Sequence, residues 1–411
     1  MTMKPPKLTL DLASPDFHRD PVPTLARLYE AGGVVETRVP ILGRLVLVGS
    51  HEATRTVLKA PETFSVSRRR RGADGGSEAA AMPWWMPKRL RLLADNMLTK
   101  DGPEHRRLRR LADGPFRRAV VLGYRDAVAR LAAPMIERTL APGGDAVRDL
   151  ARPLPLAVIC EILALPEADR PRITRLLARM SNSGSPWGLI RALPAIGALS
   201  QYLRKEIRRR RQNPGEDLIS ALAIAEDEEG EPPLSEDELL AMFFTLFVAG
   251  HETTIHLISG ALAVLPTQPE ARAALAADLS LSNAAAVELL RQVSPVQVTK
   301  PRAVTSDAEI GGIALPAGSM VLPVLIAANR DPSVFTEPER LDWHRSPNPH
   351  LGFGTGPHLC LGLHLALLEM EVVLEGVLSR APEYRVARAT GDLAYARRLG
   401  LRALKSLPLT T

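Results

Sequence analysis

A ten-residue segment near the C-terminus, Phe353–Gly362, constrains the fold of this chain more than any other feature. It reads Phe-Gly-Thr-Gly-Pro-His-Leu-Cys-Leu-Gly and combines three glycines with one cysteine, Cys360. A helical pattern follows, because apolar residues recur at spacings of four, three and four, at Leu361, Leu365, Leu368 and Val372. Cys360 therefore lies at or just before a helix N-terminus, where unpaired N–H groups and the helix dipole favour a thiolate over a thiol.

The surroundings of the two cysteines predict different roles for them. Glycines beside Cys360 leave the backbone bare, so that a flat and bulky partner can approach the sulfur closely. A soft, ionised sulfur in such a place suits a metal ligand, and we expect haem iron as the metal. Cys160 lies instead in the apolar helical run 156–163, which has no glycine, and we expect it to pack in the core.

The segment resembles the haem-binding signature of the cytochrome P-450 superfamily. The signature residues are a phenylalanine, a glycine, a basic residue, a cysteine and a glycine, here Phe353, Gly356, His358, Cys360 and Gly362. Four further stretches in the same order extend the resemblance to essentially the whole chain. It implies haem b (iron protoporphyrin IX) as cofactor, Cys360 as the axial ligand of the iron, and Phe353 and Gly354 as haem contacts. A thiolate ligand pushes electron density onto the haem iron and thereby favours cleavage of the O–O bond of bound oxygen.

The rest of the chain predicts one mainly helical domain. Its 411 residues contain no Pro/Gly/Ser-rich linker and no internal repeat, so we expect a single domain, 1–411. Residues 100–300 are largely helical in period, whereas Val34–Val39 with Leu45–Val48 predict a hairpin and 309–322 predict a second strand pair. The resemblance implies the P-450 fold, mainly α with small β-sheets and haem buried between distal and proximal helices.

Composition limits the compartment and the partners. Two distant cysteines predict a reducing compartment, and the N-terminus has neither a signal peptide nor a membrane span. We therefore expect a cytoplasmic protein without membrane contact, and a monomer. The net charge of +6 is mild, and the cluster Arg208–Arg211 closes a helix without interleaved aromatic residues, so we do not expect nucleic-acid binding.

A long helix in the middle of the chain carries the second motif. Ser235–Glu238 is a capping box, so a helix begins there and continues past Ile258. Gly250 costs this helix about 1 kcal/mol relative to alanine, which suggests a functional reason for it. The segment Ala249-Gly-His-Glu-Thr-Thr254 resembles the oxygen-activation motif of the family. The resemblance implies that Thr253 hydrogen-bonds dioxygen, that Glu252 supplies protons through water, and that Ala249 and Gly250 contact haem.

Haem carries two propionates, and buried anions need cationic partners. His105 and Arg109 are four positions apart on one predicted helix face, with Pro103 in the first turn. The resemblance implies that these two residues, together with Arg302 and His358, hold the propionates. The family usually has a proline where this chain has Gly102, so we expect a looser turn there.

A further set of residues is predicted to be structural. Glu288 and Arg291 have the spacing of an intrahelical ion pair, and the resemblance implies that Arg345 completes a buried Glu-Arg-Arg network that fixes the cysteine loop. Leu367 stands where the family usually has arginine, which puts a surface contact in doubt but not haem binding.

The substrate pocket is the least determined part of the site. By resemblance, Thr245 and Val248 on the distal helix would line it, as would Val298 and Lys300 ahead of Arg302, and the region 86–90. The irregular stretch 61–98 predicts a loop that covers the pocket. A low aromatic content of 4% suits a terpenoid, a steroid, a fatty acid or a macrolide equally well.

These features predict a haem monooxygenase that inserts one atom of O₂ into an apolar small molecule. The chain has no flavin or nicotinamide fingerprint, so electrons must come from a separate ferredoxin or flavodoxin, for which Arg106 and Arg110 could form a docking patch. The alternatives are a peroxygenase driven by hydrogen peroxide and a non-catalytic haem-binding sensor. A cysteine hydrolase is remoter, since no partner histidine lies in a matching motif.

Overall fold

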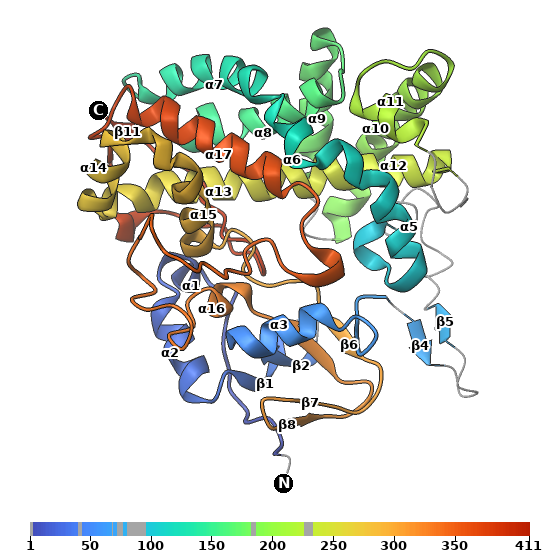
Figure 1. The fold of residues 1–411 in the computed structure, drawn as a ribbon, viewed down its shortest axis with the longest axis vertical. Coiled ribbons are helices and arrows are strands. Elements are labelled where there is room, and N and C mark those ends of the chain that lie inside the picture. The colour runs from blue at the N-terminus through green and yellow to red at the C-terminus, as the bar shows by residue number, and fades with distance from the viewer. Residues whose placement is uncertain are drawn as a thin grey trace.

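The computed structural model describes residues 3–39, 43–67, 69–71, 77–79, 96–181, 186–225 and 233–411. A large helical part and a smaller part built around a sheet pack together as one domain (Figure 1). The predicted mainly α fold with small β-sheets is confirmed.

The smaller part is organised by a five-stranded sheet with the strand order β1-β2-β9-β6-β3. Its strands are β1 (Val34–Val39), β2 (Gly43–Val48), β3 (Phe64–Ser65), β6 (Arg302–Val304) and β9 (Met320–Pro323). The predicted hairpin is present, because β1 and β2 pair antiparallel with Val34 opposite Val48. In the middle of the sheet, β6 pairs antiparallel with β9 so that Arg302 lies opposite Val321. The sheet thereby fixes the position of Arg302.

Short helices pack around this sheet, and separate two-stranded pairs lie outside it (Figure 1). The helices are α1 (Pro15–Arg19), α2 (Val22–Glu30), α3 (His51–Lys59) and α16 (Leu325–Ala328). The two-stranded pairs are β4 (Arg69–Arg71) with β5 (Ser77–Ala79), β7 (Ala308–Ile310) with β8 (Ile313–Leu315), and β10 (Arg385–Val386) with β11 (Leu409–Thr410). The second predicted strand pair thus appears as β7 and β8, which turn at Gly311 and Gly312, both with positive φ.

The helical part forms the upper half of Figure 1. Its α-helices are α5 (Gly102–Asp113), α6 (Arg118–Leu122), α7 (Arg125–Leu140), α8 (Pro153–Ile162), α9 (Arg170–Ser181), α10 (Pro186–Gln212), α11 (Leu218–Ala223), α12 (Glu236–Thr245), α13 (His251–Val264), α14 (Pro269–Ala277), α15 (Ser282–Val293) and α17 (Leu363–Leu378). Helix α17 follows the cysteine loop and packs against α7, α13 and α15. Cys160 lies buried in α8, where burial raises the pKa of its thiol to about 11, as expected of a core cysteine.

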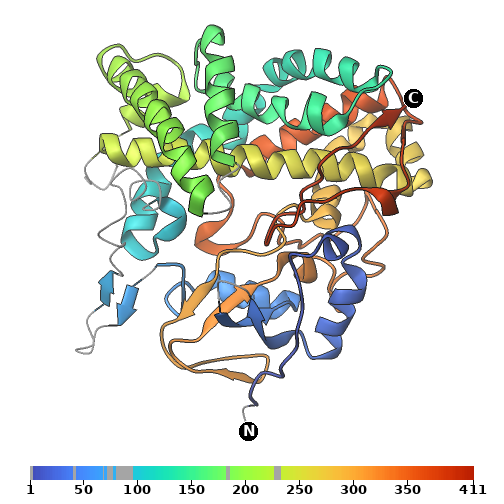
Figure 2. The same cartoon turned by 180° about the vertical axis from the view of Figure 1, so that it is seen from behind.

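The predicted long helix crosses the whole molecule as α12 and α13, drawn in yellow (Figures 1 and 2). Ser235 accepts the Glu238 N–H, and Glu238 in turn accepts the Ser235 N–H at 2.8 Å, which completes the predicted capping box. Between α12 and α13 lies one π-helical turn, Leu246–Gly250. The run Glu236–Thr267 is long and apolar enough to span a bilayer, but its most apolar window is 56% buried within the fold, as in a core helix.

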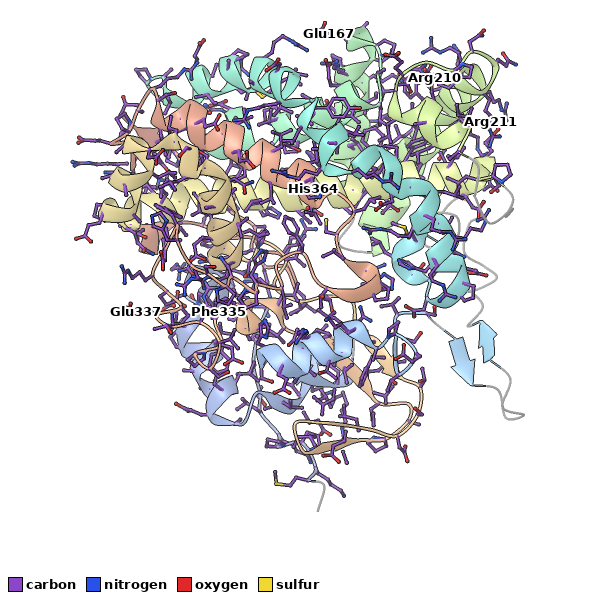
Figure 3. All side chains as sticks on the ribbon, viewed as in Figure 1. Glu167, Arg210, Arg211, Phe335, Glu337 and His364 are labelled. Carbon is purple, nitrogen blue, oxygen red and sulfur yellow. The ribbon has the colours of Figure 1, made fainter. Side chains whose placement is uncertain are left out.

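The arginine cluster at the end of α10 is engaged in ion pairs. Arg210 bonds both Glu206 and Asp217 at 2.8 Å, Arg208 pairs with Glu236, and Arg211 donates to the Leu234 carbonyl. Figure 3 shows Arg210 and Arg211 beside α10 and α11, remote from the sheet. These contacts tie α10 to its neighbouring helices.

Candidate functional site

The cysteine loop has the geometry that its glycines predict. Helix α17 begins at Leu363, three residues after Cys360, and the Cys360 N–H donates to the Phe353 carbonyl at 3.0 Å. Gly354 and Gly356 have φ values of +70° and +73°, which side chains rarely adopt. A Cβ on Gly356 would also lie 2.6 Å from the Leu58 carbonyl oxygen of α3. The loop therefore needs glycine both for its conformation and for its contact with α3.

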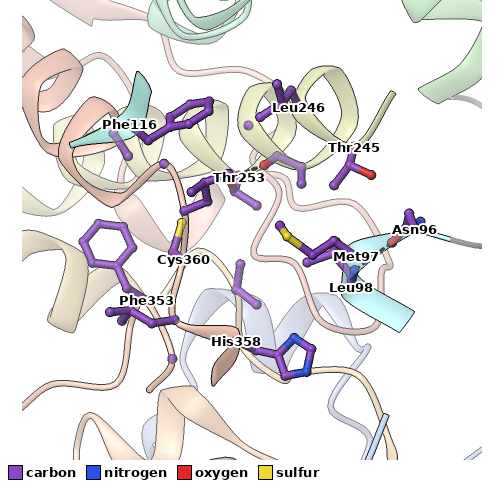
Figure 4. A pocket seen from close by; sticks show the side chains of 18 of the residues that line it. Asn96, Met97, Leu98, Phe116, Thr245, Leu246, Thr253, Phe353, His358 and Cys360 are labelled. Atoms are coloured by element: carbon purple, nitrogen blue, oxygen red, sulfur yellow. Dashed lines mark hydrogen bonds between the residues drawn. The ribbon is translucent and has the colours of Figure 1, made fainter. Parts of the chain in front are cut away.

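Cys360 lines a cavity of about 480 Å³ between the cysteine loop, α5, α13 and the start of β6. In Figure 4 its side chain points toward α13, which carries Thr253. Phe353, Gly354, Ala249 and Gly250 line the same cavity. The volume lies in the range typical of cofactor and small-molecule sites.

The structure does not support the predicted thiolate form of Cys360 in the absence of a metal. Burial raises the pKa of the thiol, while the Gly362 N–H and Arg109 act in the opposite direction without prevailing. The nearby helix N-terminus therefore does not by itself make a thiolate. A bound metal cation would do so, because a coordinating thiol is deprotonated outright.

The face of the distal helix that lines the cavity repeats every four residues. The lining residues form two rows along the helix. One row consists of Ala241, Thr245, Ala249, Thr253 and Leu257, and the other of Met242, Leu246, Gly250 and Thr254. A spacing of four advances by about 40° per step around an α-helix, so the rows would wind away from the cavity. The π-helical turn holds an extra residue and thereby keeps both rows on one face.

The prediction that Val248 lines the pocket is not met. Its side chain is 48% exposed and does not line the cavity, whereas Thr245 does. The wider turn at Leu246–Gly250 rotates Val248 away from the face that carries Thr245 and Ala249.

The two residues of the expected proton relay are separated. Thr253 lines the cavity, and its hydroxyl donates to the Ala249 carbonyl at 2.6 Å (Figure 4). Glu252 does not line the cavity, and its carboxylate pairs with Arg398 from the C-terminal segment. The structure therefore brings Thr253 to the site and holds Glu252 outside it.

His105 and His358 lie together at one edge of the cavity. Their ring centroids are 4.2 Å apart, and His358 Nε2 bonds Asp101 Oδ1 at 2.9 Å. Burial, followed by the nearby His358 and Arg109, lowers the pKa of His105 to about 4. Burial alone would raise the pKa of Asp101, but hydrogen bonds from His358, Ser65 and Ser67 lower it overall. Asp101 is therefore an anion that orients His358.

Two arginines line the same cavity. Arg109 donates from Nη1 to the Leu359 carbonyl at 2.6 Å, and Arg302 donates from Nη1 to the Phe64 carbonyl at 3.1 Å. The Nε of Arg302 is buried without a partner, and burial lowers the pKa of its guanidinium. A buried, incompletely bonded guanidinium at a cavity wall suits a carboxylate. The donor set of thiol, imidazoles and guanidiniums thus fits a metal centre with anionic arms, as in haem.

A buried ion network supports the loop from behind. Arg291 makes two bonds of 2.8 Å to the carboxylate of Glu288, and Arg345 bonds the same carboxylate at 3.0 Å. Burial alone would raise the pKa of Glu288, but the two arginines hold it below its usual value. The Arg291 guanidinium also lies 5.2 Å from the ring centre of Phe335, which Figure 3 labels.

The remaining pocket predictions have mixed outcomes. Lys300 lines the cavity, but Val298 does not, because it packs against Leu322 and Val324 beneath the sheet. The region 86–90 and most of the predicted covering loop lie outside the described residues. Sequence reasoning missed apolar residues of the wall, namely Met97, Leu98, Phe116, Ile162, Met242 and Leu246. For the last two, the four-residue spacing along the distal helix was a readable signal.

Comparison with known proteins finds similarity along the whole chain. A family model described as Cytochrome P450 matches residues 191–381. The chain is 36% identical to the cytochrome P450 monooxygenase PikC of Streptomyces venezuelae, over 99% of this chain and 95% of that protein. The solved structure of the bacillaene polyketide synthase cytochrome P450 PksS of Bacillus subtilis 168 has a TM-score of 0.86 at 29% identity and covers 97% of this chain and 99% of its own. The structure of P450BioI with hexadec-9Z-enoic acid-ligated acyl carrier protein has a TM-score of 0.82 at 31% identity, with the same coverage.

Proposed function

This chain belongs to the cytochrome P450 family, whose cofactor is haem, and we propose that it inserts one atom of O₂ into an apolar small molecule by hydroxylation or epoxidation. When bound, haem supplies the oxygen chemistry, and the protein supplies ligand, orientation and proton delivery. We further propose a monomeric, cytoplasmic enzyme.

The single cavity shared by Cys360, Thr253, two arginines and two histidines carries this proposal. Cys360 is assigned as the axial ligand of the haem iron. The propionate partners are His105, Arg109, Arg302 and His358, and the residues packed against the cofactor are Phe353, Gly354, Ala249 and Gly250. The unpartnered Nε of Arg302 supports this assignment most directly.

The proposed substrate is an aliphatic chain or ring system of low polarity. Thr245, Thr253 and Thr254 are the polar groups among the aliphatic residues of the two distal-helix rows, and Leu246, Met242 and Met97 add flexible apolar surface. The names of two relatives, one from a polyketide synthase and one bound to an acylated carrier protein, support acyl or polyketide substrates. A titration with fatty acids and macrolides, followed by the spin-state shift of the haem spectrum, tests this class.

The reduced carbon monoxide spectrum tests the axial ligand. The wild-type protein should show the red-shifted Soret band of thiolate-ligated haem, and Cys360→His should move the band to the position of histidine-ligated haem and abolish oxygenation. The core cysteine provides the matched control, because Cys160→Ser should leave the band where it is. A wild-type spectrum of the histidine type in folded protein would reject the assignment.

The proposed electron donor is a small acidic ferredoxin or flavodoxin that docks near the cysteine loop. Arg106 is exposed on α5, the helix whose Arg109 contacts Leu359 of that loop. Arg106→Glu should therefore slow reduction of the haem about 10-fold at low salt, and the difference should shrink as salt rises. Charge reversal of the exposed Arg179 on α9 serves as control. Equal, salt-independent rates for both variants would contradict this docking site.

A reaction driven by hydrogen peroxide is the second candidate function, and the position of Glu252 supports it. A peroxygenase does not need protons delivered to O₂, and Glu252 is held by Arg398 outside the cavity. The same substrate should be turned over with O₂ plus donor and with hydrogen peroxide alone. Faster turnover with peroxide would favour the second candidate, and no turnover with either would favour a sensor.

A further inference from the structure

Six basic side chains line the cavity in the part of the chain that the structure describes. Four of them are the proposed propionate partners His105, Arg109, Arg302 and His358. The other two are lysines. Lys100 pairs with Glu104 at 3.1 Å. Lys300 donates from Nζ to the Leu98 carbonyl over 3.4 Å, and it has no part in the proposed haem site.

The backbone around Lys300 is fixed by the sheet. Lys300 lies in the segment that leads into β6, where the Thr299 N–H donates to the Pro323 carbonyl of β9 at 3.1 Å. Its side chain reaches the short 3₁₀ helix η1 (Met97–Thr99), because its Nζ bonds the carbonyl of Leu98. The ammonium group therefore lies between the sheet part of the molecule and the wall that η1 contributes to the cavity.

Apolar side chains line much of the cavity that Lys300 borders. Met97 and Leu98 line it from η1, and Met242 and Leu246 line it from the distal helix. In Figure 4, Met97 and Leu98 lie on one side of the cavity and Cys360 lies on the other. A ligand that spans the cavity can therefore place one polar end at the ammonium group and bury the rest of its length against apolar side chains.

The carboxylic acids that line the cavity among the described residues contribute little net negative charge. Glu238 pairs with Arg107 at 2.8 Å, and Asp237 pairs with Arg204. Glu369 of α17 is 2% exposed, and burial raises its pKa to about 8, so the neutral acid is favoured. Positive charge therefore predominates at the described wall, which favours an anionic ligand over a cationic one.

We propose that Lys300 binds the carboxylate of a long-chain carboxylic acid and directs the apolar end of the chain toward Cys360 and Thr253. An ammonium group has three N–H donors, so it can bind a carboxylate while it retains the carbonyl of Leu98. A charge-assisted bond of this kind fixes one end of the substrate and so selects which carbon reaches the reacting centre. This proposal rests on the proposed function, because it names the substrate class of the same site.

The test titrates the haem-loaded protein with dodecanoic acid and with its methyl ester, followed by the spin-state shift of the haem spectrum. The quantity compared is the Kd of the ester divided by the Kd of the acid. Lys300→Met should lower this ratio about 5-fold relative to wild type, a modest factor because Lys300 is exposed and water weakens the ion pair. Lys300→Arg should keep the ratio of the wild type. The difference between wild type and Lys300→Met should shrink as salt rises.

Two controls accompany the titration. Lys205→Met on α10 changes an exposed lysine that does not line this cavity, and it should keep the ratio of the wild type. Haem also carries carboxylates, so haem content and the reduction potential of the haem are measured in the same variants. Both should be the same in Lys300→Met as in wild type. If Lys300→Met does not fold, Lys300→Gln replaces it in every measurement.

The outcomes separate the two proposals. A lower ratio in Lys300→Met, with the ratio kept in Lys300→Arg and Lys205→Met, supports the role of Lys300. An unchanged ratio in Lys300→Met overturns it, and a shifted potential or lost haem in that case assigns Lys300 to a propionate instead. A wild type that shows no spectral shift with either probe also overturns it, even if another apolar compound is oxygenated. A wild type that binds the acid through Lys300 but forms no product refutes the proposed function and leaves the binding role standing.

Discussion

Burial controls the protonation of the ionisable side chains around the cavity. It raises the pKa of the Cys360 thiol, lowers that of His105 to about 4, and lowers that of the Arg302 guanidinium. Each shift favours the uncharged side chain, so each charge at this site needs a counter-charge. Sulfur needs a cation and the other two need anions, which is the charge distribution of an iron porphyrin with propionates.

Glu369 should make the stability of the protein depend on pH. Its pKa is about 8 in the folded protein and 4.5 in the reference state, so the folded state binds the proton more tightly. The contribution of Glu369 to the free energy of unfolding is therefore complete below pH 4.5 and decreases as the pH rises from 4.5 to about 8. The slope of this decrease approaches about 1.4 kcal/mol per pH unit.

Urea denaturation of wild type and Glu369→Gln between these pH values measures this effect. As the pH rises, the free energy of unfolding of the wild type should decrease relative to that of Glu369→Gln. Parallel curves would mean that Glu369 has an ordinary pKa. Glu375 of the same helix pairs with Arg125, and Glu375→Gln serves as a control that should run parallel to wild type.

Two elements shape the site by departing from regular geometry. The π-helical turn keeps Thr245, Ala249 and Thr253 on one face of the distal helix. The cysteine loop uses positive φ angles at Gly354 and Gly356, which let Gly356 lie against α3 while Cys360 lines the cavity below that face. Both departures are backbone features, so side-chain substitutions elsewhere cannot replace them.

Gly356→Ala should destabilise the protein by at least about 2 kcal/mol, since a positive φ costs about 1–2 kcal/mol for alanine and the Cβ would collide with the Leu58 carbonyl. Haem retention should fall in parallel. Gly114→Ala is the control, because its φ is −48° and a Cβ there meets nothing within 4 Å. We expect that variant to be destabilised less than Gly356→Ala, because only the restriction that Pro115 places on the residue before it opposes the alanine. Equal urea midpoints for the two variants would show that the loop relaxes around the added methyl group.

At the scale of the whole molecule, the cavity lies between the helical part and the sheet part, and both contribute to it. The sheet supplies Arg302 through its register with β9, and the helices supply Thr253 and His105. Glu288 of α15 connects the helices to the segment before the cysteine loop, because it binds Arg291 of its own helix and Arg345 of that segment.

Glu288→Gln should lower the free energy of unfolding by about 3–5 kcal/mol, because it leaves two arginines without their buried counter-charge. Haem content after purification should also fall, since the loop loses its support. The matched control is Glu337→Gln, which breaks the exposed pair with Arg340 and should cost less than about 1 kcal/mol. A small effect of Glu288→Gln would mean that hydrogen bonds to the amide suffice to hold the network.

The amino-acid sequence by itself determined the features that depend on near neighbours. The capping box at Ser235, the hairpin from Val34 to Val48 and the glycine-rich loop before α17 are all local patterns, and the structure contains each of them. Their backbone conformations follow from residues a few positions apart, so the pattern carries the information.

Only the tertiary structure decided which side chains reach the cavity. The π-helical turn rotates Val248 away, the sheet buries Val298, and Glu252 pairs with Arg398, which is 146 positions away. Glu369 reads in the sequence as one more glutamate of a helix, and it lines the cavity because α13 packs on α17. These outcomes depend on contacts between distant segments, and no local pattern encodes such contacts.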